Sequence, residues 1–432
     1  MVGDEIYSFA ELLWPINRSL TGKGVRQTLE LVAEKLPELK IHSIRSGTQA
    51  FDWEIPLEWN VNSAFIESPD GNKICDFAES NLHLVGYSIP FEGVLGLEQL
   101  QHHLHSLPEQ PDAIPYVTSY YEQTWGFCLP HSIRKNLQRG SYKVKVDTTL
   151  RMGVMNIGEL YIKGDTTDEI FISTYICHPS MANNEISGPA VTTYLARWIQ
   201  SQKQRKYSYR IVFVPETIGS IYYLSKNYLN LKEKVYAGFN VTCVGDDRTH
   251  SFLPSRGGQS PSDRASKHVL SWIDKNYTQY SWKDRGSDER QYCAPGIDLP
   301  VVSLMRTKYG EYPEYHTSLD KLGTVVTPSG LHGGFKALRR AVKLLENDAI
   351  FYNKILCEPQ MGRRGLYPTL SVKKSNQKTA NMMNILSFCD GCHSVLDISE
   401  ELSLPYQVVL RILKMLERHE LVVSKDIEVT RD

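Results

Sequence analysis

The chain has 432 residues, of which 41% are hydrophobic and 22% are charged, and this balance excludes a largely disordered protein. Its 48 Lys and Arg residues against 49 Asp and Glu residues give a formal net charge of −1, which argues against a protein whose main task is to bind nucleic acid. No apolar stretch approaches the roughly 18 residues of a membrane-spanning helix, and the acidic start Met-Val-Gly-Asp-Glu is unlike a signal peptide. We therefore expect a cytoplasmic protein with no membrane-spanning segment.

The first third of the chain changes character near residue 59. A helical pattern at 10–36 is interrupted at Pro15. Residues 59–153 instead show short apolar–polar alternations separated by Pro, Gly and Asp, with one helix expected at 97–107 and a run of aromatic residues at 116–127. We interpret 59–153 as a β-rich insert.

Strand and helix patterns alternate after residue 153. Short runs rich in Ile, Val, Phe and Tyr predict strands at 169–175, 209–214, 237–244 and 299–306. Apolar residues at helical spacing predict helices at 188–200, 221–229, 262–276 and 328–346. This alternation is typical of an α/β fold, whose active site lies at the carboxyl ends of the strands. We expect one such domain, formed by 1–58 and 154–350.

The last part of the chain has the pattern of a winged helix. Residues 358–378, with prolines, glycines and arginines and no period, are interpreted as a linker. Three short helices at 379–388, 395–402 and 405–420, followed by hairpin-like alternation at 421–430, predict a winged-helix domain at 379–432. Because the third helix is barely basic, we expect it to cover the catalytic domain or a partner subunit, and DNA binding is the alternative.

Polar side chains follow four of the predicted strands. The positions, in chain order, are His178 and Glu185, then Glu216 and Thr217, then Asp246 and Asp247, then Tyr312 and His316. The carboxyl ends of parallel strands meet at one edge of a sheet, so these side chains are expected to gather there. Neutral imidazole and carboxylate are ligands that zinc takes in proteins. The sequence therefore predicts a zinc site at this edge.

The order of these motifs resembles that of the zinc aminopeptidases with a phosphorylase/hydrolase-like core. The matching motifs are His178, Asn-Asn-Glu-x-Ser-Gly from Asn183, Glu-x-x-Gly-Ser from Glu216, and Tyr-His-Thr from Tyr315 with Asp320 after it. Over nearly its whole length the chain more closely resembles the aminopeptidase-like proteins with a C-terminal winged helix that are often labelled polysaccharide-biosynthesis proteins. The motifs that carry this second resemblance include Pro-Ile-Asn-Arg-Ser-Leu-Thr-Gly from Pro15, Ile-Pro-Tyr-Val-Thr-Ser-Tyr-Tyr from Ile114, Cys-His-Pro-Ser-Met-Ala-Asn-Asn-Glu from Cys177 and Pro-Glu-Thr-Ile-Gly-Ser from Pro215. The resemblance implies a zinc-aminopeptidase-like mixed sheet with helices on both faces, a β-rich insert and a C-terminal winged helix.

Position by position, the resemblance implies that His178 and His316 bind zinc and that Glu216 is the general base. Asn184 and Thr217 stand where the aminopeptidases have acidic ligands. Because both are neutral, we expect one zinc ion rather than two. The third ligand is then expected to be a carboxylate from Glu185, Asp246 or Asp247.

The implied activity is zinc-dependent hydrolysis of an amide in a small peptide, aminoacyl or amino-sugar conjugate, with a role in polysaccharide biosynthesis. Glu216 would take a proton from water and pass it to the leaving amine. Residues expected to contact the substrate or support the site are Asn184, Thr217, Asp288, Arg290 and Tyr312.

Other interpretations of the same residues remain open. His178 is also compatible with a buried structural histidine, Asn184 with a helix cap, and Asp246 and Asp247 with a turn. The aromatic run at 116–127 is either core packing or a platform for a sugar. The alternatives to the hydrolase are a catalytically weak or inactive binding protein that uses the same cleft, and a ligand-responsive winged-helix regulator. Whether the insert forms a lid or the contact of a homo-oligomer is open.

Overall fold

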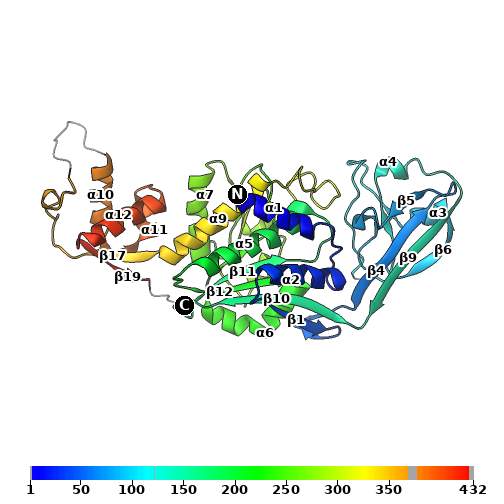
Figure 1. Cartoon of the computed structure of the whole chain (residues 1–432), viewed down its shortest axis with the longest axis horizontal. Helices are drawn as coiled ribbons and strands as arrows, with labels where there is room; N and C mark the ends of the chain where they lie inside the picture. The colour runs from blue at the N-terminus through cyan, green and yellow to red at the C-terminus, as the bar shows by residue number, and fades with distance from the viewer. Residues whose placement is uncertain (1, 121, 368–376, 428–432) are drawn as a thin grey trace. The chain divides into compact units, whose positions relative to one another are not determined.

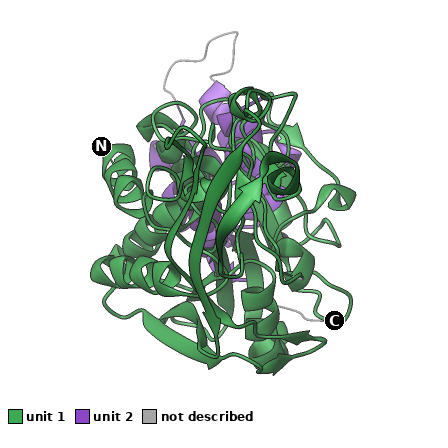
Figure 2. Cartoon of the chain, turned by 90° about the vertical axis from the view of Figure 1, so that its right-hand side faces the viewer, with its two compact units in different colours: residues 1–263, 276–338 green, residues 264–275, 339–432 purple. Residues whose placement is uncertain are grey.

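The computed structural model describes residues 2–120, 122–367 and 377–427. The chain forms two compact units, coloured separately in Figure 2. Unit 1 comprises 1–263 and 276–338, and unit 2 comprises 264–275 and 339–432. Helices α7 (Pro261–Ile273) and α9 (Pro328–Asn347) each begin in unit 1 and end in unit 2.

An eight-stranded mixed sheet forms the centre of unit 1 (Figure 1). Its strands, in spatial order, are β1 (Lys40–Arg45), β10 (Val154–Ile162), β12 (Ser208–Val214), β11 (Glu169–Tyr175), β13 (Val235–Asn240), β16 (Val301–Met305), β14 (Ser251–Leu253) and β15 (Thr278–Gln279). Strands β12, β11, β13 and β16 run parallel, whereas β1 pairs antiparallel with β10, β10 with β12, and β14 with β16. The edge strand β15 runs parallel to β14. The carboxyl ends of the four parallel strands therefore lie at one edge.

Helices cover both faces of this sheet. Helices α1 (Val2–Leu13), α2 (Lys23–Lys35) and α5 (Ser187–Ser201) pack together on one face, and α6 (Ile218–Lys234) covers the other (Figure 1). All seven residues of β11 are buried. Because successive side chains of a strand point to opposite faces, a strand covered on both faces is buried along its whole length. The predicted fold class is confirmed.

The four central strands and their helices lie where the sequence predicts them, with shifts at the ends. Among the strands the largest shift is in β13, which ends at Asn240 although the apolar run continues to residue 244. Cys243, just beyond it, adopts a φ of 51°, which no extended strand tolerates. The chain thus turns out of the sheet before the apolar run is complete.

The β-rich region has its own antiparallel sheet of four strands. In spatial order these are β5 (Lys73–Asp76), β4 (Glu58–Glu67), β9 (Ser141–Arg151) and β6 (Phe91–Gly96). The helix predicted at 97–107 is wrong beyond its first turn. Helix α3 (Leu97–Gln101) is short, and β7 (Leu104–His105) pairs with β8 (Phe127–Cys128) because the buried Leu104 belongs to the core of this region. A further short helix is α4 (His131–Arg134).

A small hairpin joins β1 to this region. Strands β2 (Gln49–Ala50) and β3 (Trp53–Glu54) pair antiparallel, and Phe51 in the turn has a φ of 54°. Trp53 is partly buried against the hydrophobic core beneath α6, so the hairpin is anchored to the domain.

Unit 2 contains the winged helix. Its helices are α10 (Gln377–Ser387), α11 (Val395–Glu401) and α12 (Tyr406–Arg418), and its sheet has the order β18 (Asp390–Ser394), β17 (Ala349–Asn353), β19 (Val422–Asp426). Ser394 caps α11 by accepting a hydrogen bond from the backbone N–H of Asp397. The predicted linker at 358–378 falls partly on 368–376, and the second strand of the predicted hairpin falls on 428–432, both outside the described residues.

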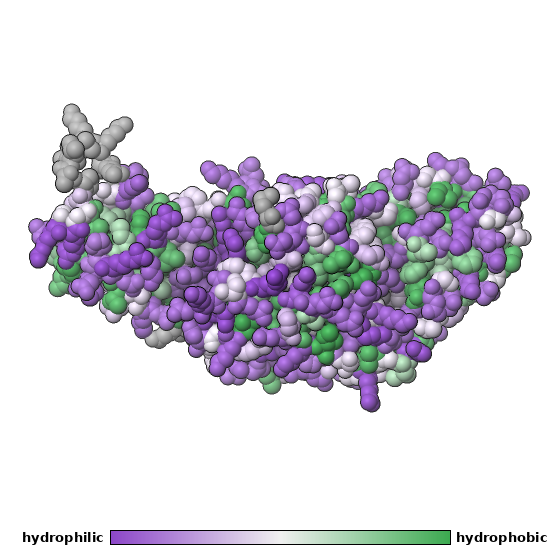
Figure 3. Space-filling view, viewed as in Figure 1, coloured by the Kyte–Doolittle hydropathy of each residue, from purple (hydrophilic) through white to green (hydrophobic). Residues whose placement is uncertain are grey.

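Hydrophobic residues on the face seen in Figure 3 are scattered among hydrophilic ones. None of the helices in the described part of the chain is long and apolar enough to cross a bilayer.

Candidate functional site

Three loops that follow parallel strands meet at one edge of the large sheet. Cys177 and His178 follow β11, Glu216 follows β12, and His316 lies in the loop after β16. All four residues line one pocket of 480 Å³. The other residues that line it are Leu20, Asp52, Trp53, Glu54, Pro56, Tyr116, Thr118, Tyr120, Thr217 and Ile218.

The two histidines are close enough to share one ion. Their ring centroids are 5.6 Å apart and the rings are inclined by 43°. A zinc ion bound at about 2.0–2.1 Å by two imidazoles at a tetrahedral angle holds the ring centroids roughly 5 Å apart. Nε2 of His316 is buried and has no hydrogen-bond partner among the described residues. The arrangement therefore fits zinc, since an unpaired buried ring nitrogen is costly unless a ligand satisfies it.

Both imidazoles are held in the neutral form that binds metal. Burial lowers the pKa of His178 to about 3, and the positive charge of Arg18 adds to this effect. Burial also lowers the pKa of His316 to about 3, with His178 as a second cause. Each ring thus keeps a free electron pair at neutral pH.

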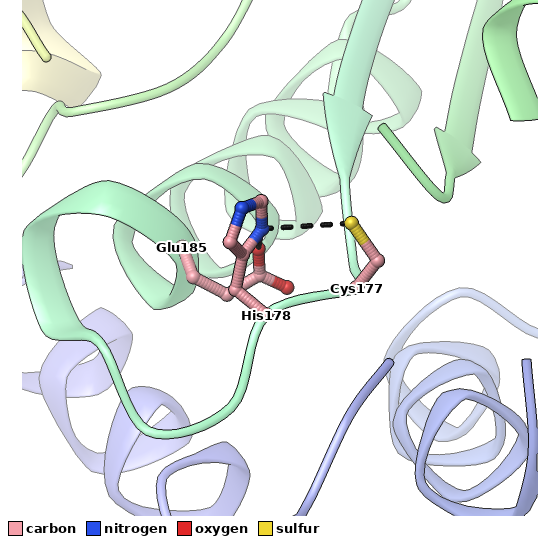
Figure 4. Close-up of side chains that lie close together, drawn as sticks. All are labelled: Cys177, His178 and Glu185. Carbon is pink, nitrogen blue, oxygen red and sulfur yellow. Dashed lines mark hydrogen bonds and ion pairs between the residues drawn. The ribbon is translucent and has the colours of Figure 1, made fainter. Parts of the chain in front are cut away.

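Glu185 contacts the other nitrogen of His178. Its Oε2 lies 3.0 Å from Nδ1, and the Sγ atom of Cys177 lies 3.5 Å from the same nitrogen (Figure 4). A carboxylate that accepts a hydrogen bond from Nδ1 fixes the ring with Nε2 free. Cys177, His178 and Glu185 also bring three donor atoms within 4.8 Å of one another. An ion among them would displace the Nδ1 hydrogen bond, and burial raises the pKa of the Cys177 thiol well above its usual range.

Arg18 supports this arrangement from the segment between α1 and α2. Its side chain is 1% exposed, and its Nε lies 3.4 Å from Oε1 of Glu185. The same Nε donates a hydrogen bond to the backbone carbonyl of His178 at 3.1 Å. Burial raises the pKa of Glu185 to about 8, and Arg18 opposes this rise. Arg18 thus holds both His178 and its carboxylate partner.

A strained turn presents Glu216 to the pocket. Thr217 has φ 65° and ψ −76°, and the N–H of Ile218 donates to the carbonyl of Glu216 at 2.8 Å, which is a γ-turn of the rare, strained kind. Asp288 holds the turn by accepting hydrogen bonds from the backbone N–H of Thr217 at 2.7 Å and from the Ser220 hydroxyl at 2.8 Å. Backbone strain that is held in place by neighbouring groups is common at functional sites.

Glu216 faces His178 across the pocket. Its Oε2 lies 3.7 Å from Nε2 of His178, and its side chain is 22% exposed. Burial raises the pKa of Glu216 to about 8, and the negative charge of Asp288 raises it further. A carboxyl group with a raised pKa is suited to accept and return a proton near neutral pH.

The region of the insert adds Tyr116, whose role the sequence did not reveal. Its ring centroid lies 5.3 Å from that of His178 and 5.2 Å from that of His316. Its backbone N–H donates to the carbonyl of His316 at 2.9 Å, and its hydroxyl lies 3.1 Å from that of Tyr120. The only signal in the sequence is the aromatic run at 116–127. A residue far from His316 in the chain thus covers both imidazoles.

Asp246 and Asp247, two of the three expected carboxylate ligands, do not line the pocket. Asp246 accepts hydrogen bonds from the backbone N–H of Thr307 at 2.8 Å and from its hydroxyl at 2.7 Å, and another from Nδ2 of Asn183 at 3.0 Å. Asp247 accepts a hydrogen bond from the Thr327 hydroxyl. Each aspartate therefore links its own loop to a neighbouring loop. A position at the end of a strand does not by itself distinguish this role from metal binding.

The remaining expected residues stabilise the loops around the pocket. The backbone N–H of Asn184 donates to Asp320 at 3.0 Å, and the Tyr312 hydroxyl donates to the same carboxylate at 2.9 Å. Arg290 donates from Nη2 to the Thr217 hydroxyl at 3.1 Å. Of the residues expected to contact substrate or support the site, only Thr217 lines the pocket.

Comparison with known proteins identifies the family. Residues 7–348 match the family described as a domain of unknown function, DUF4910, and residues 349–424 match a winged helix-turn-helix family. A protein of Clostridium acetobutylicum, named as a polysaccharide biosynthesis protein with an aminopeptidase-like domain, is 39% identical over 422 residues, which cover 97% of this chain and 96% of the relative.

Solved structures support the same assignment. A crystal structure from Clostridium acetobutylicum, described as that of a peptidase, has a TM-score of 0.92 at 38% identity and covers 98% of this chain and 96% of its own. A zinc aminopeptidase from Bacillus subtilis has a TM-score of 0.57 at 14% identity over 79% of this chain and 94% of its own, which is a likeness of fold. The chain therefore belongs to the DUF4910 family and combines an aminopeptidase-like domain with a C-terminal winged helix.

Proposed function

We propose that the chain is a zinc-dependent amide hydrolase of the aminopeptidase type. The observation that carries the proposal is the pair of neutral imidazoles, with ring centroids 5.6 Å apart, beside the carboxyl group of Glu216 in one pocket. His178 and His316 would hold one zinc ion through their Nε2 atoms. Zinc bound there supplies a Lewis acid, which polarises an amide carbonyl and makes water a better nucleophile.

The side chains around this ion have separate tasks in the proposal. Glu216 accepts the proton of the attacking water at a carboxylate oxygen and passes it to the nitrogen of the leaving amine. Glu185 keeps the proton of His178 on Nδ1, so that Nε2 stays free. The ring of Tyr116 covers both histidines and excludes bulk water, which strengthens the electrostatic interactions of the site.

The substrate would be a small peptide, aminoacyl or amino-sugar conjugate. A pocket of 480 Å³ is of the size that holds a small molecule or the end of a peptide. The name of the Clostridium relative supports a place in polysaccharide biosynthesis. The winged helix would then serve to dock a partner or to cover the enzyme.

A second candidate is a binding protein that uses the same pocket with little or no catalysis. Asn184 and Thr217 stand where the aminopeptidases have acidic ligands, and Asp246 is engaged elsewhere. The ion would then have fewer protein ligands than in a two-metal enzyme. The third candidate, a DNA-binding regulator, has less support, because the exposed charges of α12 are Arg411, Lys414 and Arg418 with Glu420 just beyond, and Lys414 is paired with Glu417.

Metal content and hydrolysis together test the proposal. Protein purified without chelators should contain one zinc per chain and hydrolyse aminoacyl 4-nitroanilides. The variants His178→Ala and His316→Ala should lose the metal, whereas His102→Ala, at an exposed histidine outside the pocket, should keep it. Zinc retained in both site variants would overturn the proposal, and zinc binding without hydrolysis of any amide would favour the binding protein.

A further inference from the structure

The charged residues that line the pocket are all acidic. They are Asp52 and Glu54 from the β2–β3 hairpin and Glu216 from the loop after β12, and no Lys or Arg is among the lining residues. Like charges that line a cleft focus the field and raise the local concentration of ligands of opposite charge. The pocket thus favours cations and disfavours acidic ligands.

The two hairpin carboxylates are free to meet a ligand. Both side chains are exposed, and neither forms an ion pair with a cation of the described residues. Among the described residues, the carboxylate of Glu54 has one hydrogen-bond partner, Nε2 of Gln49, which donates to its Oε2 at 2.8 Å. Neither carboxylate is needed to hold the hairpin against the domain, because Trp53 between them does this.

Aromatic rings complete the chemistry of a cation site. Trp53, Tyr116 and Tyr120 line the same pocket as the carboxylates. An ammonium group is attracted to the face of such rings, and its alkyl chain packs against them. A protonated amine on an apolar stem therefore matches both the charge and the apolar surface of this pocket.

The hairpin is separate from the loops that would carry out hydrolysis. His178, Glu216 and His316 follow parallel strands of the large mixed sheet, whereas Asp52 and Glu54 precede β4, the first strand of the insert. A simple aminoacyl amide offers one ammonium group, so two further carboxylates exceed what it can neutralise. A substrate with two amines balances the charge better.

We propose that Asp52 and Glu54 make the pocket selective for substrates that carry a second protonated amine besides the α-amine, as in conjugates of lysine or of other diamino acids. This inference rests on the proposed hydrolase function for its catalytic readout. The amine would lie between the hairpin carboxylates and the aromatic rings.

Three chromogenic amides with the same α-amine and the same leaving group measure the effect of the charge on the substrate side chain. They are the 4-nitroanilides of lysine, norleucine and glutamate, whose side chains are positive, neutral and negative. The kcat/KM for the lysine compound should exceed that for norleucine by roughly five- to tenfold, since each exposed charge pair contributes a few-fold. The glutamate compound should be the poorest substrate, and the preference should fall as salt is raised.

The variant Asp52→Asn/Glu54→Gln removes both charges and keeps their shape. It should abolish the preference for lysine, so that kcat/KM for the lysine compound falls to that for the norleucine compound. Glu30→Gln, at an exposed position of α2 outside the pocket, is the matched control and should keep the preference. Equal kcat/KM values for lysine and norleucine in the wild-type protein would overturn the inference and leave the hydrolase proposal intact.

Binding measurements separate this inference from the hydrolase proposal. Lysinol and norleucinol carry no scissile bond, and their affinities can be measured by titration calorimetry even if the protein hydrolyses nothing. Tighter binding of lysinol, lost in the double variant, would support the inference even if the hydrolase proposal failed. Equal binding of the two alcohols, or binding of neither, would overturn it.

Discussion

The buried cation Arg18 supports the site without lining its pocket, so its substitution tests the support of His178 separately from contact with a ligand. Its guanidinium group donates to the carbonyls of His178 at 3.1 Å and Leu13 at 2.7 Å, and lies 3.4 Å from Glu185. The substitution Arg18→Met keeps a similar apolar volume but leaves the Glu185 carboxylate without its counter-ion. Removing one partner of a buried ion pair costs about 3–5 kcal/mol, and we expect a loss of this size in the free energy of unfolding.

The pH dependence of this loss has a definite sign. Burial raises the pKa of Glu185 from 4.5 to about 8 although Arg18 opposes the rise, so without Arg18 the pKa should rise further. The folded protein then holds the proton more tightly than the unfolded chain does, and stability falls as pH rises above 4.5. The part of the Arg18→Met deficit that comes from Glu185 should therefore be constant up to about pH 8, where both folded proteins hold the proton, and grow above that pH.

The same substitution should weaken zinc binding without touching a ligand. Without Arg18, the guanidinium no longer holds the backbone carbonyl of His178 or the carboxyl group of Glu185, so the His178 ring is less firmly oriented towards the ion. Loss of such supporting interactions typically lowers metal affinity by about 10- to 100-fold. Competition with a chromogenic chelator measures this affinity, and chemical unfolding measures stability.

Two further variants serve as controls for Arg18→Met. Arg248→Met removes an exposed arginine paired with Glu314 and should change stability by less than about 1 kcal/mol. Arg18→Met/Glu185→Met should recover most of the lost stability but not the zinc affinity, because no carboxylate remains to orient His178. A supporting role of Arg18 is excluded if Arg18→Met lowers the free energy of unfolding no more than Arg248→Met does, or if the zinc affinity of Arg18→Met equals that of the wild type.

Three other outcomes follow from the site and its surroundings. Glu216→Gln should retain zinc and lower kcat by about 10²- to 10⁴-fold, so unchanged steady-state kinetics would exclude Glu216 as the general base. Tyr116→Ala should weaken zinc binding, because water then reaches both imidazoles, whereas Tyr116→Phe should keep it, as isothermal titration can measure. Burial alone would raise the pKa of Glu58, but hydrogen bonds from Arg26 and neighbouring groups lower it from 4.5 to about 2. The ionised Glu58 therefore stabilises the fold above pH 4.5, and this contribution is lost as pH falls towards 2. Acid titration of unfolding should show this loss in wild type and not in Glu58→Gln.

The sequence predicts what depends on local pattern. Short apolar runs, each followed by apolar residues at helical spacing, predict the strands β11, β12, β13 and β16. Because parallel strands end at the same edge of a sheet, their order also predicts that His178, Glu216 and His316 lie close together, as they do in the pocket. These predictions need only the order of the elements along the chain. They do not depend on which side chains finally touch.

The contacts that complete the site join segments far apart in the chain, so no local pattern in the sequence indicates them. Arg18 donates to His178 across 160 positions, and Tyr116 comes from the region of the insert. Asp246 follows a strand, as His178 and Glu216 do, but its carboxylate oxygens accept hydrogen bonds from the backbone N–H and the hydroxyl of Thr307. Strand β17 also escaped prediction, because its partners β18 and β19 lie far along the chain.

The central claim is that one zinc ion lies between His178 and His316. Anomalous diffraction at the zinc edge, from crystals of protein purified without chelators, tests it directly. The account predicts a single peak at about 2.0–2.1 Å from Nε2 of both histidines. A peak on the Nδ1 side of His178, between Cys177 and Glu185, or no peak within the pocket, would contradict it.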